Sequence, residues 1–165
     1  MLIALHPGGY YESQRWHKEN FVLLAKKILN KYKAKVVVIG GGADAKLLDY
    51  IISHINDKNV EACNQGIKDL VSLLSKCKLL ICNNSGPLHL AAALGVPTVS
   101  MMGPTDPVRW WPKGKNNIVF RKGLECSPCS RGKCLLHKCM DLITPEEVFQ
   151  ATENLLGKVY GIKSG

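Results

Sequence analysis

The sequence predicts one α/β domain in which helices cover both faces of a parallel sheet. Short apolar runs alternate with helix-periodic segments about five times along the 165 residues. Parallel strands need crossover connections, and the intervening helices supply them. Glycine-rich stretches also follow the apolar runs, at Gly8–Gly9, Gly40–Gly42, Ser85–Gly86 and Gly103–Pro104. In a parallel sheet these turns share the carboxyl edge, where such sheets bind ligands.

Each element has a local signal. Residues 2–6 form an apolar run that stops at Pro-Gly-Gly, and the segment after it repeats apolar residues at helical spacing. The last helix has Thr144 as N-cap, Pro145 at its first position and Glu147 at its third. We expect strands at 2–6, 34–39, 59–63, 78–84, 96–103 and 118–123, helices at 19–32, 44–55, 67–77, 85–95 and 144–156, a loop at 107–117 and an irregular insert at 126–139.

Composition suits a globular domain that attracts anions. The chain is 46% apolar, and its 22 basic and 13 acidic residues give a net charge of +9 that is scattered along the sequence. Such charge favours nucleotides, phosphorylated lipids or nucleic acid without choosing between them. The Arg109–Trp111 loop could stack on bases, but no RNA-binding signature accompanies it, so we expect no nucleic-acid partner. No apolar run is long enough to span a membrane and no signal peptide is evident, which predicts a cytosolic protein.

The start of the helix at 85–95 is the main candidate site. Ser85 can cap the helix, Gly86 lets the chain approach a ligand closely, and Pro87 is tolerated in the first turn. Free amides and the helix dipole favour a phosphate there, and His89 could donate to one of its oxygens. The alternative is an ordinary N-cap with a histidine that faces the core.

A second glycine-rich turn, Gly40–Ala45, fits the dinucleotide-binding pattern G-x-G-x-x-A, with Glu61 near the position of a ribose-binding acid. The same glycines also serve any chain that leaves a strand and begins a helix.

The seven cysteines fall into two groups. Cys63, Cys77 and Cys82 lie in apolar segments and are expected to be reduced and buried. Cys126, Cys129, Cys134 and Cys139 follow the spacing C-x2-C-x4-C-x4-C, which can close a structural zinc site. Reduced thiols or a disulfide are the alternatives, and no activating group points to a catalytic cysteine.

Three segments together resemble the C-terminal half of glycosyltransferase family 9, the ADP-heptose:lipopolysaccharide heptosyltransferases. The family pattern P-G-(x)n-K-R-W-P-x-E-x-F is similar to Pro7–Gly8 through Gln14–Phe21. The signature N-D-S-G-P-x-H-x-A-A-A-L-G-x-P resembles residues 83–97, and G-P-T-D-P follows at 103–107. The four-cysteine insert is similar to one found in many members.

The resemblance implies a Rossmann-like, three-layer α/β/α domain of a GT-B enzyme that inverts configuration and needs no metal for catalysis. By this resemblance the donor, ADP-heptose or a similar nucleotide-sugar, has its diphosphate against Ser85, Gly86 and Arg15, with Gly8, Gly9 and His89 nearby. The nucleoside then lies between the turn Gly40–Asp44, with Gly41 and Asp44 as its binding residues, and the segment Gly66–Ile67. The acceptor is the lipopolysaccharide core, at the cytosolic face of the inner membrane.

Two departures from the family pattern bear on this assignment. Asn84 replaces the acid that contacts the donor sugar in the family, and Gln14 replaces a lysine. The resemblance also places the general base and the acceptor surface in an N-terminal domain that residues 1–165 do not include. We therefore assign no catalytic residue and expect a single domain, excised or from a truncated reading frame, that binds donor without turnover. A non-catalytic nucleotide-binding module and an NAD-type domain remain as alternatives.

Overall fold

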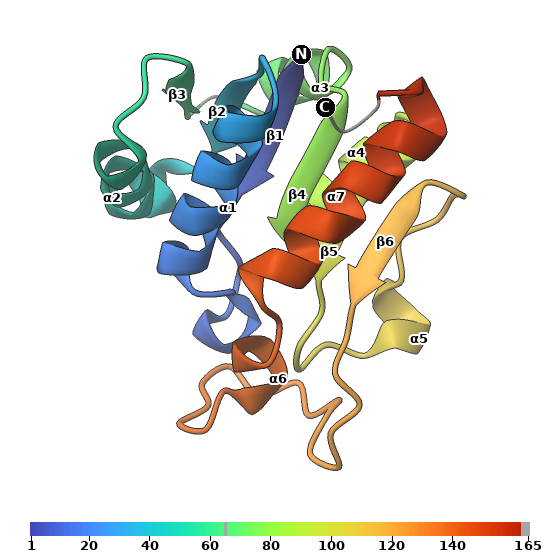
Figure 1. Cartoon of the computed structure of the whole chain (residues 1–165). Helices are drawn as coiled ribbons and strands as arrows, with labels where there is room; N and C mark the ends of the chain where they lie inside the picture. Colours follow the sequence, from blue (N-terminus) through green and yellow to red (C-terminus); the bar gives the residue numbers. More distant parts are fainter. Residues whose placement is uncertain (65, 163–165) are drawn as a thin grey trace.

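The computed structural model describes residues 1–64 and 66–162, which form one six-stranded parallel sheet (Figure 1). The strands are β1 (Leu2–His6), β2 (Lys35–Ile39), β3 (Val60–Cys63), β4 (Leu79–Asn83), β5 (Thr98–Met101) and β6 (Asn117–Phe120). Their order is β3-β2-β1-β4-β5-β6. The chain thus winds outward from β1 in one direction and from β4 in the other, and the direction changes between these two strands.

Helices cover both faces of the sheet, which confirms the predicted three-layer arrangement. The longer helices are α1 (Lys18–Lys31), α2 (Ala45–Ile55), α3 (Ile67–Leu74), α4 (Gly86–Ala93) and α7 (Pro145–Tyr160), and the short ones are η1 (Glu12–Gln14), η2 (Gly42–Asp44), α5 (Pro107–Trp110) and α6 (Lys138–Asp141). Helices α1, α2 and α7 pack on one face, and α3 and α4 pack on the other.

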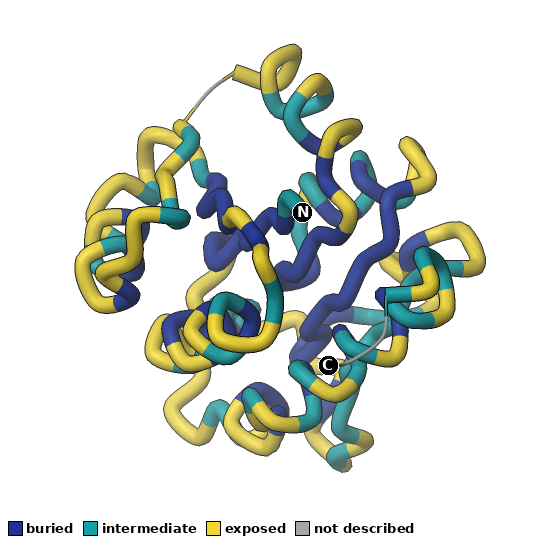
Figure 2. Tube along the Cα trace, turned by 45° about the horizontal axis from the view of Figure 1, so that its top comes forward, coloured by how far each residue is buried: buried dark blue, intermediate teal, exposed yellow. Residues whose placement is uncertain are grey.

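Side chains of the central strands alternate between two cores. In β1, Ile3 and Leu5 belong to the core beneath α1 and α7, whereas Ala4 belongs to the core beneath α3 and α4. In β4, Leu79 and Ile81 face the first core and Leu80 and Cys82 face the second. Strands buried on both faces need apolar residues at every position, which explains their unbroken apolar sequences. Figure 2 shows the strands as the buried centre of the molecule.

Local signals placed most element ends within two residues of their observed positions. The Thr144 hydroxyl accepts a hydrogen bond from the Glu147 amide at 3.2 Å, as the N-cap motif predicts. The segment expected to be a loop at 107–117 begins instead with the single-turn helix α5, because Asp106 Oδ1 accepts from the Val108 amide at 2.9 Å. No helix in the described residues is long and apolar enough to cross a membrane.

The irregular insert packs against the segment that leads into α1. The Ser13 amide donates to Gly132 O at 3.2 Å, and the Ser13 hydroxyl donates to Arg131 O. Farther along, Trp16 Nε1 donates to Ile143 O at 2.8 Å. Residues more than 110 positions apart are therefore joined next to the carboxyl edge of the sheet.

Candidate functional site

The carboxyl ends of β1 and β4 lie side by side where the winding of the sheet reverses. His6, the last residue of β1, is in register with Cys82, the residue before the end of β4. Open parallel sheets bind ligands in the crevice at this position, because the loops that follow the two strands turn away from each other. The loop that starts at Pro7 and the turn Asn84–Ser85 flank this crevice.

Asn83 joins the two sides of the crevice, although sequence reasoning did not select it. Its fully buried side chain accepts from the Trp16 amide at 2.9 Å and donates to the carbonyls of Pro7 at 2.8 Å and Gly8 at 3.0 Å. The sequence did contain a signal for this role, because Asn83 is a polar residue at the end of an otherwise apolar strand. Asn83 fixes the glycine loop at a set distance from β4.

Ser85 is the N-cap residue of α4, but its hydroxyl does not cap the helix. It lies 3.0 Å from His6 Nδ1 and donates to Asn83 O at 3.2 Å. The expectation that the Ser85 side chain caps α4 is thus wrong, because a buried histidine and a strand carbonyl hold the hydroxyl. The opening amides of α4 consequently have no side-chain cap and remain suited to an anion.

His6 is a second residue that the sequence analysis left out of the site. Burial lowers its pKa from 6.5 to about 4, while the Asp44 carboxylate acts to raise the pKa and the Arg15 charge acts to lower it. The imidazole is therefore neutral near pH 7 and serves as a hydrogen-bonding partner for Ser85 rather than as a cation.

A cavity of about 330 Å³ opens beside His6, between α3, α4 and the ends of β2 and β3. Three of the residues predicted to bind the donor, Gly41, Ile67 and Gly86, line it. The other walls are mostly apolar and include Ile39 and Leu90. The volume lies at the lower end of the usual range for small-molecule sites, which starts at about 300 Å³.

Gly8 and Asp44 meet next to this cavity. A Cβ atom on Gly8 would lie 2.9 Å from Asp44 Oδ2, closer than real Cβ contacts allow, so any larger residue at position 8 would displace the Asp44 carboxylate. The same carboxylate oxygen accepts from the Gly41 amide at 3.0 Å. Gly66, also predicted to bind the donor, is the N-cap residue of α3.

Arg15 lies on a different cavity from Gly41 and Ile67. Its Nε and Nη2 donate to Gly9 O at 3.0 and 2.7 Å, which holds the glycine loop against η1. The side chain lines a larger cavity of about 820 Å³ between η1, α1 and the insert. Arg15 and Gly9, both predicted to bind the donor, are therefore joined to each other by hydrogen bonds but do not line the smaller cavity.

Asn84 and His89 face Trp110, the last residue of α5. Asn84 Nδ2 donates to Trp110 O at 3.1 Å, a bond that the aspartate of the family pattern could not make. The His89 ring lies 5.9 Å from the Trp110 ring, and burial lowers the His89 pKa. His89 Nε2 is buried without a hydrogen-bond partner among the described residues. Neither side chain lines the smaller cavity.

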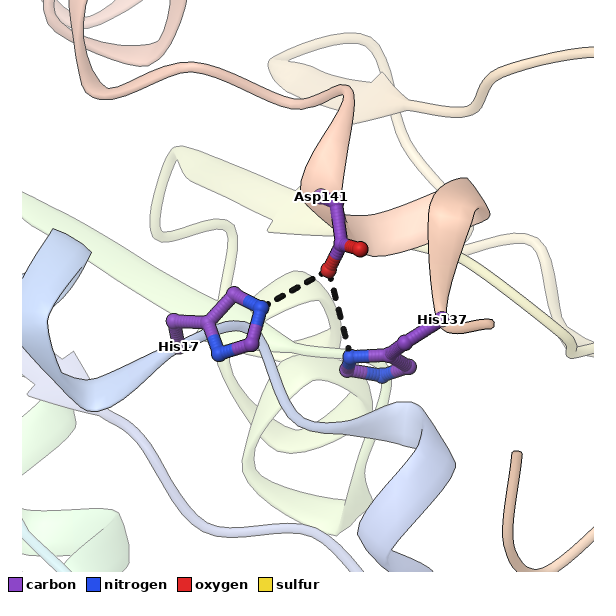
Figure 3. A group of neighbouring side chains, drawn as sticks. All are labelled: His17, His137 and Asp141. Atoms are coloured by element: carbon purple, nitrogen blue, oxygen red, sulfur yellow. Dashed lines mark hydrogen bonds and ion pairs between the residues drawn. The ribbon is translucent and has the colours of Figure 1, made fainter. Parts of the chain in front are cut away.

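The four cysteines of the insert differ in exposure. Cys126, Cys129 and Cys134 are exposed, and Cys139 is buried beside Gly103. Burial raises the Cys139 pKa, and the charges of the other three thiols act in the same direction. Yet the group of potential ligands whose atoms lie within 4.8 Å of one another in residues 1–64 and 66–162 is His17, His137 and Asp141 (Figure 3). The zinc site at the four cysteines stays a prediction.

The structure gives no support to an NAD-type site at Gly40. That turn follows β2, whereas a dinucleotide-binding turn follows the first strand of its unit. Glu61 lies in β3, in register with Val37 of β2. It lines a separate cavity with Met1 and Leu2 at the amino end of the strands, away from the Gly40 turn.

Comparison with known proteins gives consistent results. Residues 1–140 match the family described as glycosyltransferase family 9 (heptosyltransferase). The chain is 32% identical over 164 residues to lipooligosaccharide heptosyltransferase 2 of Campylobacter jejuni, a match over 94% of this chain and 51% of that relative. Escherichia coli ADP-heptose lps heptosyltransferase II has a similar structure, with a TM-score of 0.83, 25% identity, and coverage of 95% of this chain and 46% of that one.

Escherichia coli heptosyltransferase WaaC, solved with ADP, has the same fold at a TM-score of 0.78 and 19% identity, over 93% of this chain and 44% of that one. The chain spans about half the length of the curated relatives it matches.

Proposed function

Because this chain belongs to glycosyltransferase family 9, we propose that it is the part of an inverting GT-B heptosyltransferase that binds the nucleotide-sugar donor, ADP-heptose or a similar compound. The observation that carries this proposal is the uncapped amino end of α4 at the point where the winding of the sheet reverses. Backbone amides and the helix dipole favour a diphosphate there, and the neutral His6–Ser85 pair leaves the amides free of a competing side chain.

The cavity of about 330 Å³ provides a place for the nucleoside next to the proposed diphosphate site. Gly86 both lines this cavity and begins α4, so one ligand can reach from the apolar walls to the helix amides. WaaC, which shares this fold, was solved with ADP, and that supports a nucleoside diphosphate as the ligand class.

In the proposed reaction an acceptor hydroxyl of the lipopolysaccharide core attacks the anomeric carbon of the donor sugar. The new C–O bond forms as the bond to the β-phosphate breaks, ADP leaves with the electron pair, and a base takes the hydroxyl proton. The α4 amides stabilise the charge of the leaving diphosphate. Arg15 lines the neighbouring cavity, and its charge, which also acts on His6, adds to the positive potential at this edge of the sheet. We place the general base and the acceptor surface outside residues 1–165. In this proposal the transfer reaction needs no metal ion and takes place at the cytosolic face of the inner membrane.

A second candidate, nucleotide binding without sugar transfer, is favoured by Asn84. The Asn84 side-chain amide donates to Trp110 O. It stands where the family pattern has an acid that contacts the donor sugar. The two candidates differ in their response to the sugar: a donor-binding domain binds ADP-heptose more tightly than ADP, whereas a plain nucleotide module does not distinguish them.

Calorimetric titration with ADP, ADP-heptose, UDP and NAD tests the proposal. We expect preference for the adenosine diphosphate ligands, and we expect Ser85→Asp to weaken ADP binding at least tenfold, about 1.4 kcal/mol, because it adds a negative charge at the α4 amides. Ile67→Asp, at an exposed residue of the cavity wall, should weaken ADP binding about fivefold by removing apolar contact, about 1 kcal/mol.

Asn154→Asp is the matched control, because it adds the same charge on an exposed position of α7. It should leave ADP affinity unchanged, and thermal unfolding checks that each variant is folded. Stronger binding of NAD, absence of binding to any nucleoside diphosphate, or unchanged ADP affinity in a folded Ser85→Asp protein would contradict the proposed site.

A further inference from the structure

Three side chains from segments far apart in the sequence converge beside the larger cavity (Figure 3). His17 Nε2 lies 2.7 Å from Asp141 Oδ1, and His137 Nδ1 lies 3.5 Å from the same oxygen. The three ligand atoms all fall within 4.8 Å of one another. We propose that His17, His137 and Asp141 form a binding site for a divalent transition-metal ion of the zinc class, distinct from the predicted site made by the four cysteines together.

The hydrogen bond on the far side of the His137 ring supports this assignment. His137 Nε2 lies 3.0 Å from Ser13 O, and a carbonyl oxygen can only accept, so the Nε2 proton is donated there. In the neutral ring Nδ1 then carries a lone pair, and this lone pair faces a carboxylate oxygen. Two acceptors that face each other need a cation between them, and that cation is either a metal ion or a second proton on the ring. Metal-binding histidines typically donate their other N–H to a backbone carbonyl in this way.

The backbone and the spacing also suit a metal ion. His137 has a φ of 43°, which is uncommon for a residue with a side chain, and such positions cluster at functional sites. Zinc binds imidazole nitrogen and carboxylate oxygen at about 2.0–2.2 Å, so neighbouring ligand atoms of a tetrahedral ion lie about 3.3–3.6 Å apart. The distance of 3.5 Å from His137 Nδ1 to Asp141 Oδ1 already fits, whereas His17 Nε2, at 2.7 Å, must withdraw by about 0.6–0.9 Å.

Two imidazoles and one carboxylate leave a coordination position for water or another ligand. His17, His137 and Cys134 all line the larger cavity, and Cys134 Sγ accepts from the His137 amide at 3.4 Å. Cys134 Sγ lies outside the group of ligand atoms that are within 4.8 Å of one another, so it reaches an ion there only by moving closer, and water is otherwise the fourth ligand. An ion held there would tie the insert to the start of α1, beside Arg15.

Position 17 provides a variant that removes a ligand with little effect on the backbone. The family pattern has proline where this chain has His17, and the φ of −57° at His17 already suits proline. His54, which is exposed and stacked on Tyr50, is the matched control histidine. Replacing Cys126 and Cys129 together tests the alternative in which the insert cysteines hold the metal.

The experiment is titration of the reduced chain with Co²⁺, followed by its visible absorption, and competition with Zn²⁺. We expect one equivalent to bind, and we expect His17→Pro and Asp141→Asn each to weaken binding at least tenfold. His54→Gln and the double variant Cys126→Ser/Cys129→Ser should bind as the parent chain does. Zinc should raise the unfolding temperature of the parent chain but not that of His17→Pro.

Absorption from a sulfur–cobalt bond that disappears in Cys134→Ser would identify Cys134 as the fourth ligand, and its absence would assign that position to water. The proposal is overturned if no saturable Co²⁺ binding occurs, which would leave a protonated histidine paired with Asp141. It is equally overturned if the double cysteine variant loses the metal while His17→Pro retains it.

Discussion

The buried His6 makes the stability of the domain depend on pH in a defined window. Burial lowers the His6 pKa from 6.5 to about 4 in the folded chain. As pH falls below 6.5 the unfolded chain binds a proton at this residue and the folded chain does not, so the free energy of unfolding decreases. Above pH 6.5 neither state carries the proton, and His6 contributes no dependence. The loss is complete near pH 4.

The difference between these pKa values sets the size of the effect. Each pKa unit is worth about 1.4 kcal/mol, so the change from 6.5 to about 4 corresponds to a loss of about 3 kcal/mol across the window. Most domains are stable by only 5–15 kcal/mol, and a loss of this size is easily measured. Other titrating groups contribute as well, which is why a variant is needed to isolate His6.

The variant is His6→Asn, whose amide can still reach the Ser85 hydroxyl but does not titrate. Urea unfolding at pH 7, 6, 5 and 4 gives the free energy of unfolding of the parent chain and of His6→Asn. The value for the parent chain minus the value for His6→Asn should fall by about 3 kcal/mol from pH 7 to pH 4. His54→Asn, at an exposed histidine, is the control and should keep the pH dependence of the parent chain. Parallel pH profiles for His6→Asn and the parent chain would refute the reasoning.

Two further predictions concern stability. Asn83→Ala removes a buried side chain that makes three hydrogen bonds and should lower the free energy of unfolding by about 3 kcal/mol or more; a loss below about 1 kcal/mol in urea unfolding would show that Asn83 does not hold the glycine loop. Thr144→Ala removes the N-cap of α7 and should cost about 1 kcal/mol, which Thr144→Ser should largely restore; equal stability of the three proteins would contradict the capping role.

Features set by neighbours in sequence were predictable. The β-strands, the helices and the Thr144 cap follow from apolar spacing and from residues within one helical turn, and the structure confirms them. The short helix α5 was missed because one side-chain bond from Asp106 decides it. The strand order was not predicted, since alternation of strands and helices fits several orders; it follows only from the pairing of β1 with both β2 and β4.

The candidate site was predictable only in part, for a similar reason. Glycines that follow strands indicate the carboxyl edge of the sheet as the candidate site, and Gly41, Ile67 and Gly86 line one cavity there. The sequence could not show that His6 takes the Ser85 hydroxyl, because the two residues are 79 positions apart. His17 and Asp141 are likewise 124 positions apart, and no spacing rule connects them.

Asn83 and Asn84 are adjacent in the sequence, yet deamidation would affect the structure differently at the two positions. Hydrolysis of the Asn83 amide to an acid would replace the donor that faces the Pro7 and Gly8 carbonyls with a third electronegative oxygen. The same chemical damage at Asn84 would cost one bond, to Trp110 O. Each deamidation at Asn83 should therefore loosen the domain more than one at Asn84.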